Sequence, residues 1–402
     1  MNRIRDLLLP ATAAIGLCCG VSILCLTLFT YLAAPIAAEF SIGKAQVSGM
    51  LTAHLVALMF ALPLAGALAD RFRPLHVVMV SGAAFAATLW LASLASSPTA
   101  LYCAFAAAGL FGAGTAPITY ARVIVARYHA RRGLALGVAF TGIGLAAIVL
   151  PPIIAPIAAA DGWRAALRAM ALLAIAAALI GGMGLGGSAP RVSAAFAQTD
   201  DDGIDLAAAL RTKFFWIMAG AFLLLGAALL GVVAHLAAAF GAFGLGTDAT
   251  VRFQLFFGIA TIVGRLLGGA SMDWLPARQV GAIAALCGAA GALATGTLQA
   301  AAPVALIGFL LGFCSGAESD VVSYLVSRRF GPKHFARIYG IQGSLFMLGA
   351  ALGPILAAVL AERLGYAAIW LAASAALIVS AAGIALLRNQ APERTASTAR
   401  AA

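Results

Sequence analysis

The chain has 402 residues, of which 63% are hydrophobic and only 10% are charged, and its mean hydropathy is +1.03. Soluble domains carry about 25% charged residues, so this composition excludes an ordinary soluble domain and indicates a polytopic membrane protein. A net charge of +11 would suggest a nucleic-acid partner in a soluble protein, so the distribution of the basic residues has to be considered.

Apolar runs that could each cross about 30 Å of hydrocarbon as a helix recur along the whole chain. The twelve runs are 12–38, 45–69, 76–96, 99–126, 133–158, 164–186, 213–240, 250–271, 278–300, 303–327, 335–361 and 366–387. The first run is about twice as long as the apolar core of a signal peptide, so we interpret it as an uncleaved helix. The sequence predicts an all-α membrane protein with twelve transmembrane helices.

The basic residues are distributed unequally between the two sides of the predicted membrane. With the N-terminus inside, 18 of the 25 Lys and Arg residues fall on cytoplasmic segments, five fall outside, and Arg122 and Arg265 lie within helices. This asymmetry follows the positive-inside rule and is compatible with anionic lipid contact. We therefore expect an integral protein of the lipid bilayer, in a bacterial inner (plasma) membrane, with both termini cytoplasmic and no nucleic-acid partner.

One long connection lacks apolar character and divides the chain. It covers residues 187–212 and carries the acids Asp200, Asp201, Asp202 and Asp205. Runs of like charge usually stay in water, so this segment is predicted to be a solvated cytoplasmic linker. The predicted domains are a six-helix bundle over residues 1–186 and a second over residues 213–402.

A repeat supports this division into halves. Three separate places match at an offset of 203 residues: "GALAD" (Gly66–Asp70) with "GASMD" (Gly269–Asp273), Gly137 with Gly340, and Gly162-Trp163 with Gly365-Tyr366. Secondary transporters are often built from such repeated halves around a central site.

The stretch "GALADRFRP" resembles the signature between helices 2 and 3 of the major facilitator superfamily, G-x-x-x-D-R-x-G-R/K-R/K. Gly66, Asp70 and Arg71 match it, whereas Arg73 stands where a second glycine is usual and Pro74 where a basic residue is usual. The resemblance implies two pseudo-symmetric six-helix bundles and a gating role for Gly66, Asp70, Arg71 and the repeated acid Asp273.

Further segments resemble the monocarboxylate porter and oxalate:formate antiporter branch of that superfamily. They are "RRGLALGVAFTGIGLAAIVLPP", "GWR", "FFW" and "GRLLGGASMD". Two features depart from the pattern: Thr261 stands where an acid would precede Arg265 by four residues, and no arginine lies around Ala108.

Elementary chemistry gives the gating residues a role of their own. Gly66 permits close helix approach, and Asp70 at the cytoplasmic end can accept hydrogen bonds from a helix N-terminus or from an arginine of the other half. Such a contact would hold the protein in one state.

Charged residues within membrane helices usually mark a transport pathway. Arg265 and Asp320 lie about 12 Å from the cytoplasmic ends of their helices, so they share a depth. Glu318 is about 200° round the helix from Asp320, so Arg265 is not expected to hold both acids at once. Asp320 shares its face with Gly316 and Tyr324, which predicts a cavity wall with Asp320 as the proton-coupling acid and Tyr324 at the substrate. Glu318 is the secondary proton-coupling candidate, or a packing residue, and a purely structural pair with Arg265 remains an alternative.

Weaker substrate-binding candidates are Arg122, which could also reach the inner surface or the gate, and Tyr120, Tyr31 and His235, which could equally be packing residues. The histidines are scattered, no nucleophile opposes the acids, and no Gly-rich phosphate loop follows a strand. We therefore expect no enzyme activity, no metal site and no cofactor.

The residues favour a secondary active transporter that moves a small organic anion, preferably a monocarboxylate, together with a proton. The alternatives are an organic-anion exchanger of the oxalate:formate type, a proton-driven drug or metabolite exporter, and a nontransporting membrane sensor or channel. The oligomeric state is left open.

Overall fold

Helices cover almost all of the described chain, which in this computed structural model comprises residues 2–128, 131–186, 203–299 and 303–387. The first half contains α1 (Asn2–Cys18), α2 (Val21–Phe40), α3 (Lys44–Arg71), α4 (Pro74–Ala92), α5 (Pro98–Gly112), the 3₁₀ turn η1 (Ala113–Thr115), α6 (Pro117–Arg127), α7 (Arg132–Val149) and α8 (Pro151–Gly186). The second half contains α10 (Leu206–Leu210), α11 (Lys213–Ala242), α12 (Thr247–Ser271), α13 (Ala277–Leu298), α14 (Val304–Phe330), α15 (Phe335–Leu364) and α16 (Tyr366–Leu386).

Several predicted helices of the first half are interrupted for local reasons. Pro117 and Pro151 each open a new helix, because proline lacks the N–H that would continue the preceding one. The first run breaks at Gly20, where the hydroxyl of Thr115 accepts the N–H of Val21 at 3.1 Å and so caps α2. The two interruptions, between α1 and α2 and at η1, therefore pack against each other.

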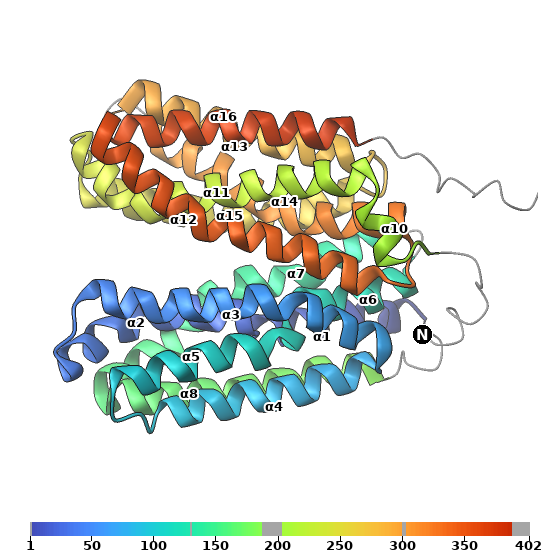
Figure 1. The fold of residues 1–402 in the computed structure, drawn as a ribbon, viewed down its shortest axis with the longest axis horizontal. Helices are drawn as coiled ribbons and strands as arrows, with labels where there is room; N and C mark the ends of the chain where they lie inside the picture. The colour runs from blue at the N-terminus through green and yellow to red at the C-terminus, as the bar shows by residue number, and fades with distance from the viewer. Residues whose placement is uncertain (1, 129–130, 187–202, 300–302, 388–402) are drawn as a thin grey trace, which may run out of the picture.

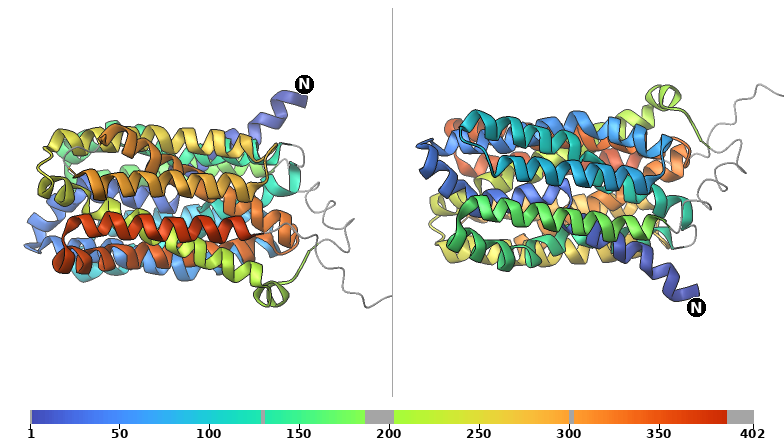
Figure 2. Two further views of the ribbon diagram at one scale, coloured as in Figure 1. Left: turned by 90° about the horizontal axis from the view of Figure 1, so that it is seen from above. Right: turned by 90° about the horizontal axis from the view of Figure 1, so that it is seen from below.

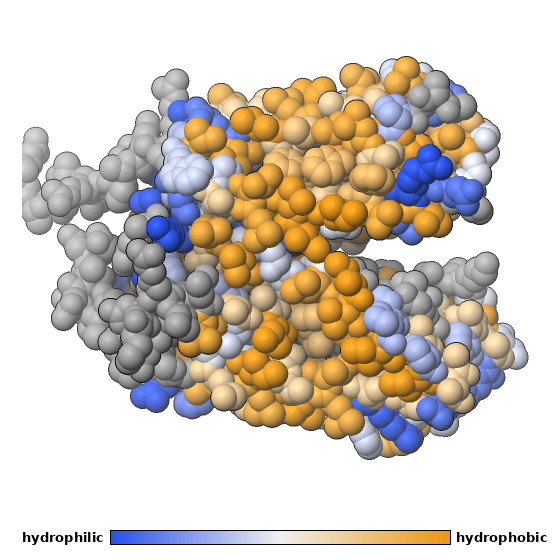
Figure 3. Space-filling model, turned by 180° about the vertical axis from the view of Figure 1, so that it is seen from behind, coloured by the Kyte–Doolittle hydropathy of each residue, from blue (hydrophilic) through white to orange (hydrophobic). Residues whose placement is uncertain are grey.

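Ten stretches of the described chain are long and apolar enough to cross a membrane. One of them, residues 132–185, has 54 residues and contains two predicted helices that meet at a kink at Gly162. The first predicted run covers parts of α1 and α2 and is not among these ten. The two helices within residues 132–185 and the first predicted run, added to the other nine stretches, give the twelve expected helices. An apolar band covers the middle of the surface (Figure 3). The predicted all-α membrane fold is confirmed for the described residues.

The helices lie in two layers that run along the long axis of the molecule. Helices α1 to α8 form one layer and α11 to α16 the other (Figure 1), and the views from above and below show the helices of each layer side by side (Figure 2). Between the layers, α3 packs along α15 and α7 packs along α12. These two helix pairs form the interface between the halves.

The geometry reproduces the repeat of 203 residues. Gly162 and Gly365 both have a φ of 81°, a backbone conformation that side chains other than glycine rarely adopt. Gly137 packs against the backbone of α12, and Gly340 packs against the backbone of α3. Equivalent glycines therefore have equivalent environments in the two halves.

Part of the predicted solvated linker is folded. The carboxylate of Asp205 accepts the N–H of Ala208 at 2.6 Å and caps the short helix α10, and the N–H of Ile204 donates to the carbonyl of Phe330 at 3.0 Å. Asp200, Asp201 and Asp202 lie outside the described residues. We call the end of the molecule that carries α10 the linker end, and the opposite end, where α2 and α11 finish, the far end (Figure 1).

Candidate functional site

At the linker end, Asp70 joins the two halves. Its carboxylate accepts the backbone N–H groups of Ala336 at 3.3 Å and Arg337 at 2.9 Å, in the first turn of α15. Helix α15 has no side-chain cap of its own, so Asp70 satisfies donors that the helix leaves free. The expected hydrogen bonds to a helix N-terminus of the other half are thus present, and Gly66 permits them by packing directly on the carbonyl of Ala336.

Arg122 completes this contact from the same half as Asp70. Its Nε donates to the Asp70 carboxylate at 2.8 Å and its Nη2 donates to the Asp70 carbonyl at 3.0 Å, with only 7% of the arginine exposed. Arg122 does not line the cavity described below, and of its two predicted positions the structure shows the one at the gate.

Asp273 makes the equivalent contact in the opposite direction. Its two carboxylate oxygens accept the N–H groups of Gly133 at 2.8 Å and Leu134 at 3.1 Å, in the first turn of α7, which also lacks its own side-chain cap. Each acid of the repeat thus caps the helix of the other half at the same two positions. Arg71 is exposed beside Phe72 with its guanidinium 5.7 Å from the ring centre, away from both caps.

These contacts close the linker end, and the molecule is hollowed at the other end. The space-filling view shows the two layers parted at the far end, while they meet toward the linker end (Figure 3). The structure therefore has one closed and one open side.

A central cavity of about 280 Å³ lies between the halves. Its polar side chains come from the second half, from α12, α14 and α15: Arg265, Ser315, Glu318, Ser319, Tyr339 and Gln342. Among the described residues, the first half contributes apolar side chains from α3, η1 to α6, and α7: Leu55, Leu62, Ala116, Pro117, Ile118 and Ile143. Ala116 and Pro117 lie at the interruption between η1 and α6, so a broken helix lines the site, as in many transporters.

Arg265 is the charged donor of this cavity. It is 4% exposed, and its Nε and Nη1 have no hydrogen-bond partner within the described part of the chain. A buried guanidinium with free N–H groups is costly unless an anion meets it, and its planar fork matches a carboxylate. The predicted position of Arg265 at a polar site is consistent with this geometry.

The face assigned to Asp320 from the sequence is wrong. Gly312 and Gly316 pack on the carbonyls of Phe257 and Thr261, so the stripe that continues to Asp320 is the contact face of α14 with α12. Asp320 follows Gly316 by four residues on α14, and Arg265 follows Thr261 by four residues on α12, so the next position along this contact sets Asp320 opposite Arg265. The sequence correctly places Gly316 and Asp320 on one face of the helix. Small residues along a membrane helix, however, mark a contact with another helix rather than a cavity wall.

Asp320 is fully buried in this contact and does not line the cavity. Neither of its carboxylate oxygens has a hydrogen-bond partner among the described residues. Glu318, expected on a packing face, instead lines the cavity with Arg265; one of its oxygens accepts the hydroxyl of Ser319 at 2.9 Å and the other is unpaired. Arg265 lies within electrostatic range of both acids, and neither forms a direct salt bridge with it.

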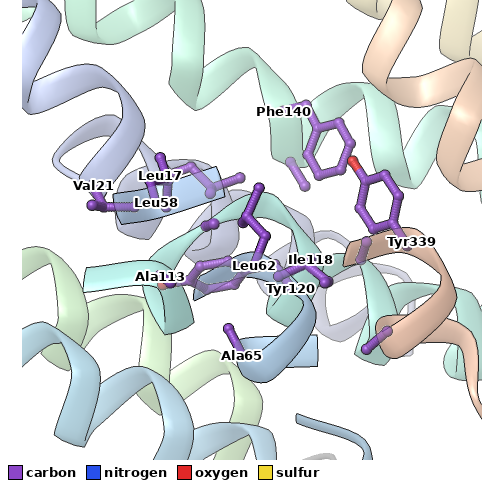
Figure 4. Close-up of a cluster of buried hydrophobic side chains, with 14 of the residues drawn as sticks. Leu17, Val21, Leu58, Leu62, Ala65, Ala113, Ile118, Tyr120, Phe140 and Tyr339 are labelled. Carbon is purple, nitrogen blue, oxygen red and sulfur yellow. The ribbon is translucent and has the colours of Figure 1, made fainter. Parts of the chain in front are cut away.

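Three further candidates lie away from the cavity. Tyr324 accepts a hydrogen bond from Arg328 at 3.1 Å toward the linker end. His235 is hydrogen-bonded to the carbonyl of Pro354 at 3.0 Å, between α11 and α15. Tyr120 is fully buried inside the first half, where its hydroxyl packs on glycines of α1 and α8; Figure 4 shows it within a cluster of apolar side chains. None of these three residues lines the cavity in this conformation.

The side chain of Tyr31 lies outside the described part of the structure. Conversely, Tyr339 and Gln342 of α15 line the cavity and were not among the predicted residues. Figure 4 shows Tyr339 across the interface from Phe140 of α7. Gln342 could have been found, because it is a polar residue inside a run of apolar ones, which is the same signal that identified Glu318. The amide nitrogen of Gln342 donates to the carbonyl of Phe215 at 3.2 Å, and its oxygen has no hydrogen-bond partner among the residues that the structure describes.

Two helical halves, contacts that close one end, and a cavity between them are an arrangement typical of membrane transporters. The chain belongs to the Major Facilitator Superfamily, whose family model matches residues 15–317 and 292–402. Members of this family are transporters, and this chain is a transporter rather than an enzyme.

Relatives and solved structures agree with this membership. Monocarboxylate transporter 13 of Bos taurus is 27% identical over 352 residues, which are 85% of this chain and 80% of that protein. An uncharacterized 38 kDa protein in a 23S RNA operon of Thermoproteus tenax is 28% identical over 328 residues, or 78% of this chain and 79% of that one.

Among solved structures, the transporter FucP in its outward conformation has a TM-score of 0.70 and 12% identity, and the match covers 95% of this chain and 99% of FucP. The human organic anion transporter MFSD10 has a TM-score of 0.69 and 15% identity, with 94% and 99% covered. These two likenesses show the fold alone.

Proposed function

We propose that this transporter moves a small organic anion, a monocarboxylate, together with a proton. The observation that carries the proposal is Arg265, a buried guanidinium that faces the central cavity with unpaired N–H groups. A substrate carboxylate would accept two parallel hydrogen bonds from this fork. The similarity to monocarboxylate transporter 13 supports the same class of substrate.

A proton would make this binding possible without leaving unbalanced charge in the site. We propose that Asp320, beside Arg265 in the contact of α12 and α14, pairs with the arginine when it is ionised and releases it when it is protonated. Glu318 lines the cavity and would exchange the proton with water. It would therefore take a more direct part in proton coupling than a residue that only packs between helices. Proton and substrate would then reinforce each other's binding through one shared cation.

The two halves would supply the movement. We propose that residues 1–186 and 213–402 are domains joined by the linker 187–212, and that they rock about the cavity. With both termini in the cytoplasm of a bacterial cell, the linker end would be cytoplasmic and this conformation would be an outward-facing state. Asp70 and Asp273 would hold that state by capping α15 and α7.

The proposal is tested by uptake into proteoliposomes. Labelled lactate, pyruvate, formate and oxalate are offered while the pH gradient and the membrane voltage are imposed separately. We expect saturable accumulation of monocarboxylates that follows an inwardly directed proton gradient, and loss of uptake in Arg265→Gln. The matched control is Arg252→Gln, which removes an exposed arginine from the first turns of the same helix.

Other results would replace the proposal. Uptake that needs a counter-anion inside and ignores the pH gradient would establish an exchanger. Accumulation driven by an outwardly directed proton gradient would establish an antiporter, and the absence of flux for every acid of the panel and for pentanoate and hexanoate would leave a nontransporting role.

A further inference from the structure

The chemistry of the central cavity is divided between its two walls. Alongside apolar residues, the second half supplies the cation, the acid, two hydroxyls, a phenol and an amide, while the described part of the lining from the first half is entirely aliphatic. A pathway for a small, uniformly polar substrate would need hydrogen-bonding groups on both sides. The division matches an amphipathic ligand instead.

The cost of burying polar groups makes the apolar wall selective for the tail of the substrate. A hydroxyl or second carboxylate placed against Leu55, Ile143 and Pro117 would lose its water and find no partner among the described residues of that wall, which costs far more than leaving it in solution. A methylene in the same place gains about fourfold in affinity for each group buried. The apolar wall therefore favours hydrocarbon and excludes polar tails.

We infer that the substrate is an amphipathic monocarboxylate with an unsubstituted aliphatic tail, bound with its carboxylate at Arg265 and its tail against α3, η1 to α6, and α7. This inference rests on the proposed function and adds the chemistry of the tail. Leu55 and Ile143 are then residues that determine specificity.

Binding constants of pairs of acids with equal numbers of non-hydrogen atoms test the tail directly. Pentanoate is compared with 4-hydroxybutanoate, and hexanoate with succinate, by isothermal titration calorimetry on the purified full chain. We expect pentanoate and hexanoate to bind at least tenfold more tightly than their polar partners. Equal or tighter binding of 4-hydroxybutanoate and succinate would overturn the inference.

Variants locate the effect on the apolar wall. Leu55→Gln places an amide in the cavity, and the preference for pentanoate over 4-hydroxybutanoate should fall at least fivefold. The matched control is Leu64→Gln on the same helix, whose side chain is 57% exposed and does not line the cavity, and this variant should keep the preference. Ile143→Thr is a milder second variant if Leu55→Gln does not fold. An unchanged preference in both cavity variants would overturn the assignment.

Pentanamide separates this inference from the proposed function. If it binds as tightly as pentanoate, the anion site at Arg265 is wrong, although the apolar wall stands. If acids bind through Arg265 with an affinity that does not depend on the tail, the proposed function stands and the inference is wrong.

Discussion

Replacing Asp70 by asparagine should open the linker end. The carboxylate accepts three hydrogen bonds, from Arg122 and from the N–H groups of Ala336 and Arg337. Asparagine keeps one acceptor, removes the charge and turns an NH₂ group toward one of these donors. Hydrogen bonds to a charged group contribute about 1.5–3 kcal/mol, and the helix N-terminus adds about 0.3–1 kcal/mol, so we expect the closed state to lose about 3 kcal/mol.

A loss of this size is large in terms of populations. At about 1.4 kcal/mol for each factor of ten, 3 kcal/mol changes the ratio of open to closed molecules about 100-fold. If about one molecule in a hundred is open at the linker end in the parent protein, about half would be open in Asp70→Asn. Asp273→Asn, which weakens the equivalent cap on α7, should shift the same equilibrium by a somewhat smaller factor, because no arginine is bonded to that acid among the described residues.

Distances between spin labels on the two halves measure the shift. In a cysteine-free background, labels at the exposed positions Arg73 and Lys333 report on the linker end, and labels at Ser41 and Ala242 report on the far end. We expect the first distance to lengthen and the second to shorten. Asp248→Asn, which neutralises an exposed acid at the far end of α12, should change neither distance. Parent-like distances in both Asp70→Asn and Asp273→Asn would refute the assignment of these caps as the closing contacts.

Arg265→Lys should bind substrate at least tenfold more weakly than the parent protein, because an ammonium lacks the planar fork, and calorimetry with pentanoate measures this; unchanged affinity would remove the arginine from the site. Asp320→Asn imitates a protonated acid and should keep substrate exchange while losing accumulation driven by the pH gradient. Glu318→Gln should slow proton-coupled uptake without abolishing exchange. Normal pH-driven accumulation in Asp320→Asn together with its loss in Glu318→Gln would transfer the proton-coupling role to Glu318. Gly316→Ala would push a methyl group into the backbone of α12 and should destabilise the protein by about 1–3 kcal/mol, seen as a lower Tm. The control Gly220→Ala, where a methyl group meets nothing within 4 Å, should leave the Tm unchanged. Equal Tm values for the two variants would contradict the close packing of α12 and α14.

The class of protein and its architecture followed from the sequence. Hydrocarbon leaves a backbone few ways to satisfy its polar groups, so long apolar runs predict membrane helices reliably. The offset of 203 residues placed equivalent parts correctly: Gly162 and Gly365 share a backbone conformation, and Asp70 and Asp273 cap equivalent helices. These features depend on local chemistry or on repetition, both of which are legible in one chain.

The orientation of the polar side chains was decided only by the tertiary structure. Glu318 and Asp320 were correctly set on different faces of one helix, but the sequence does not state which face meets α12 and which meets the cavity. Arg122 could reach the cavity or the gate by its position alone, and it lies at the gate because Asp70 accepts its N–H groups. A helical period gives the angle between side chains, whereas the neighbour that each side chain meets depends on how separate helices pack.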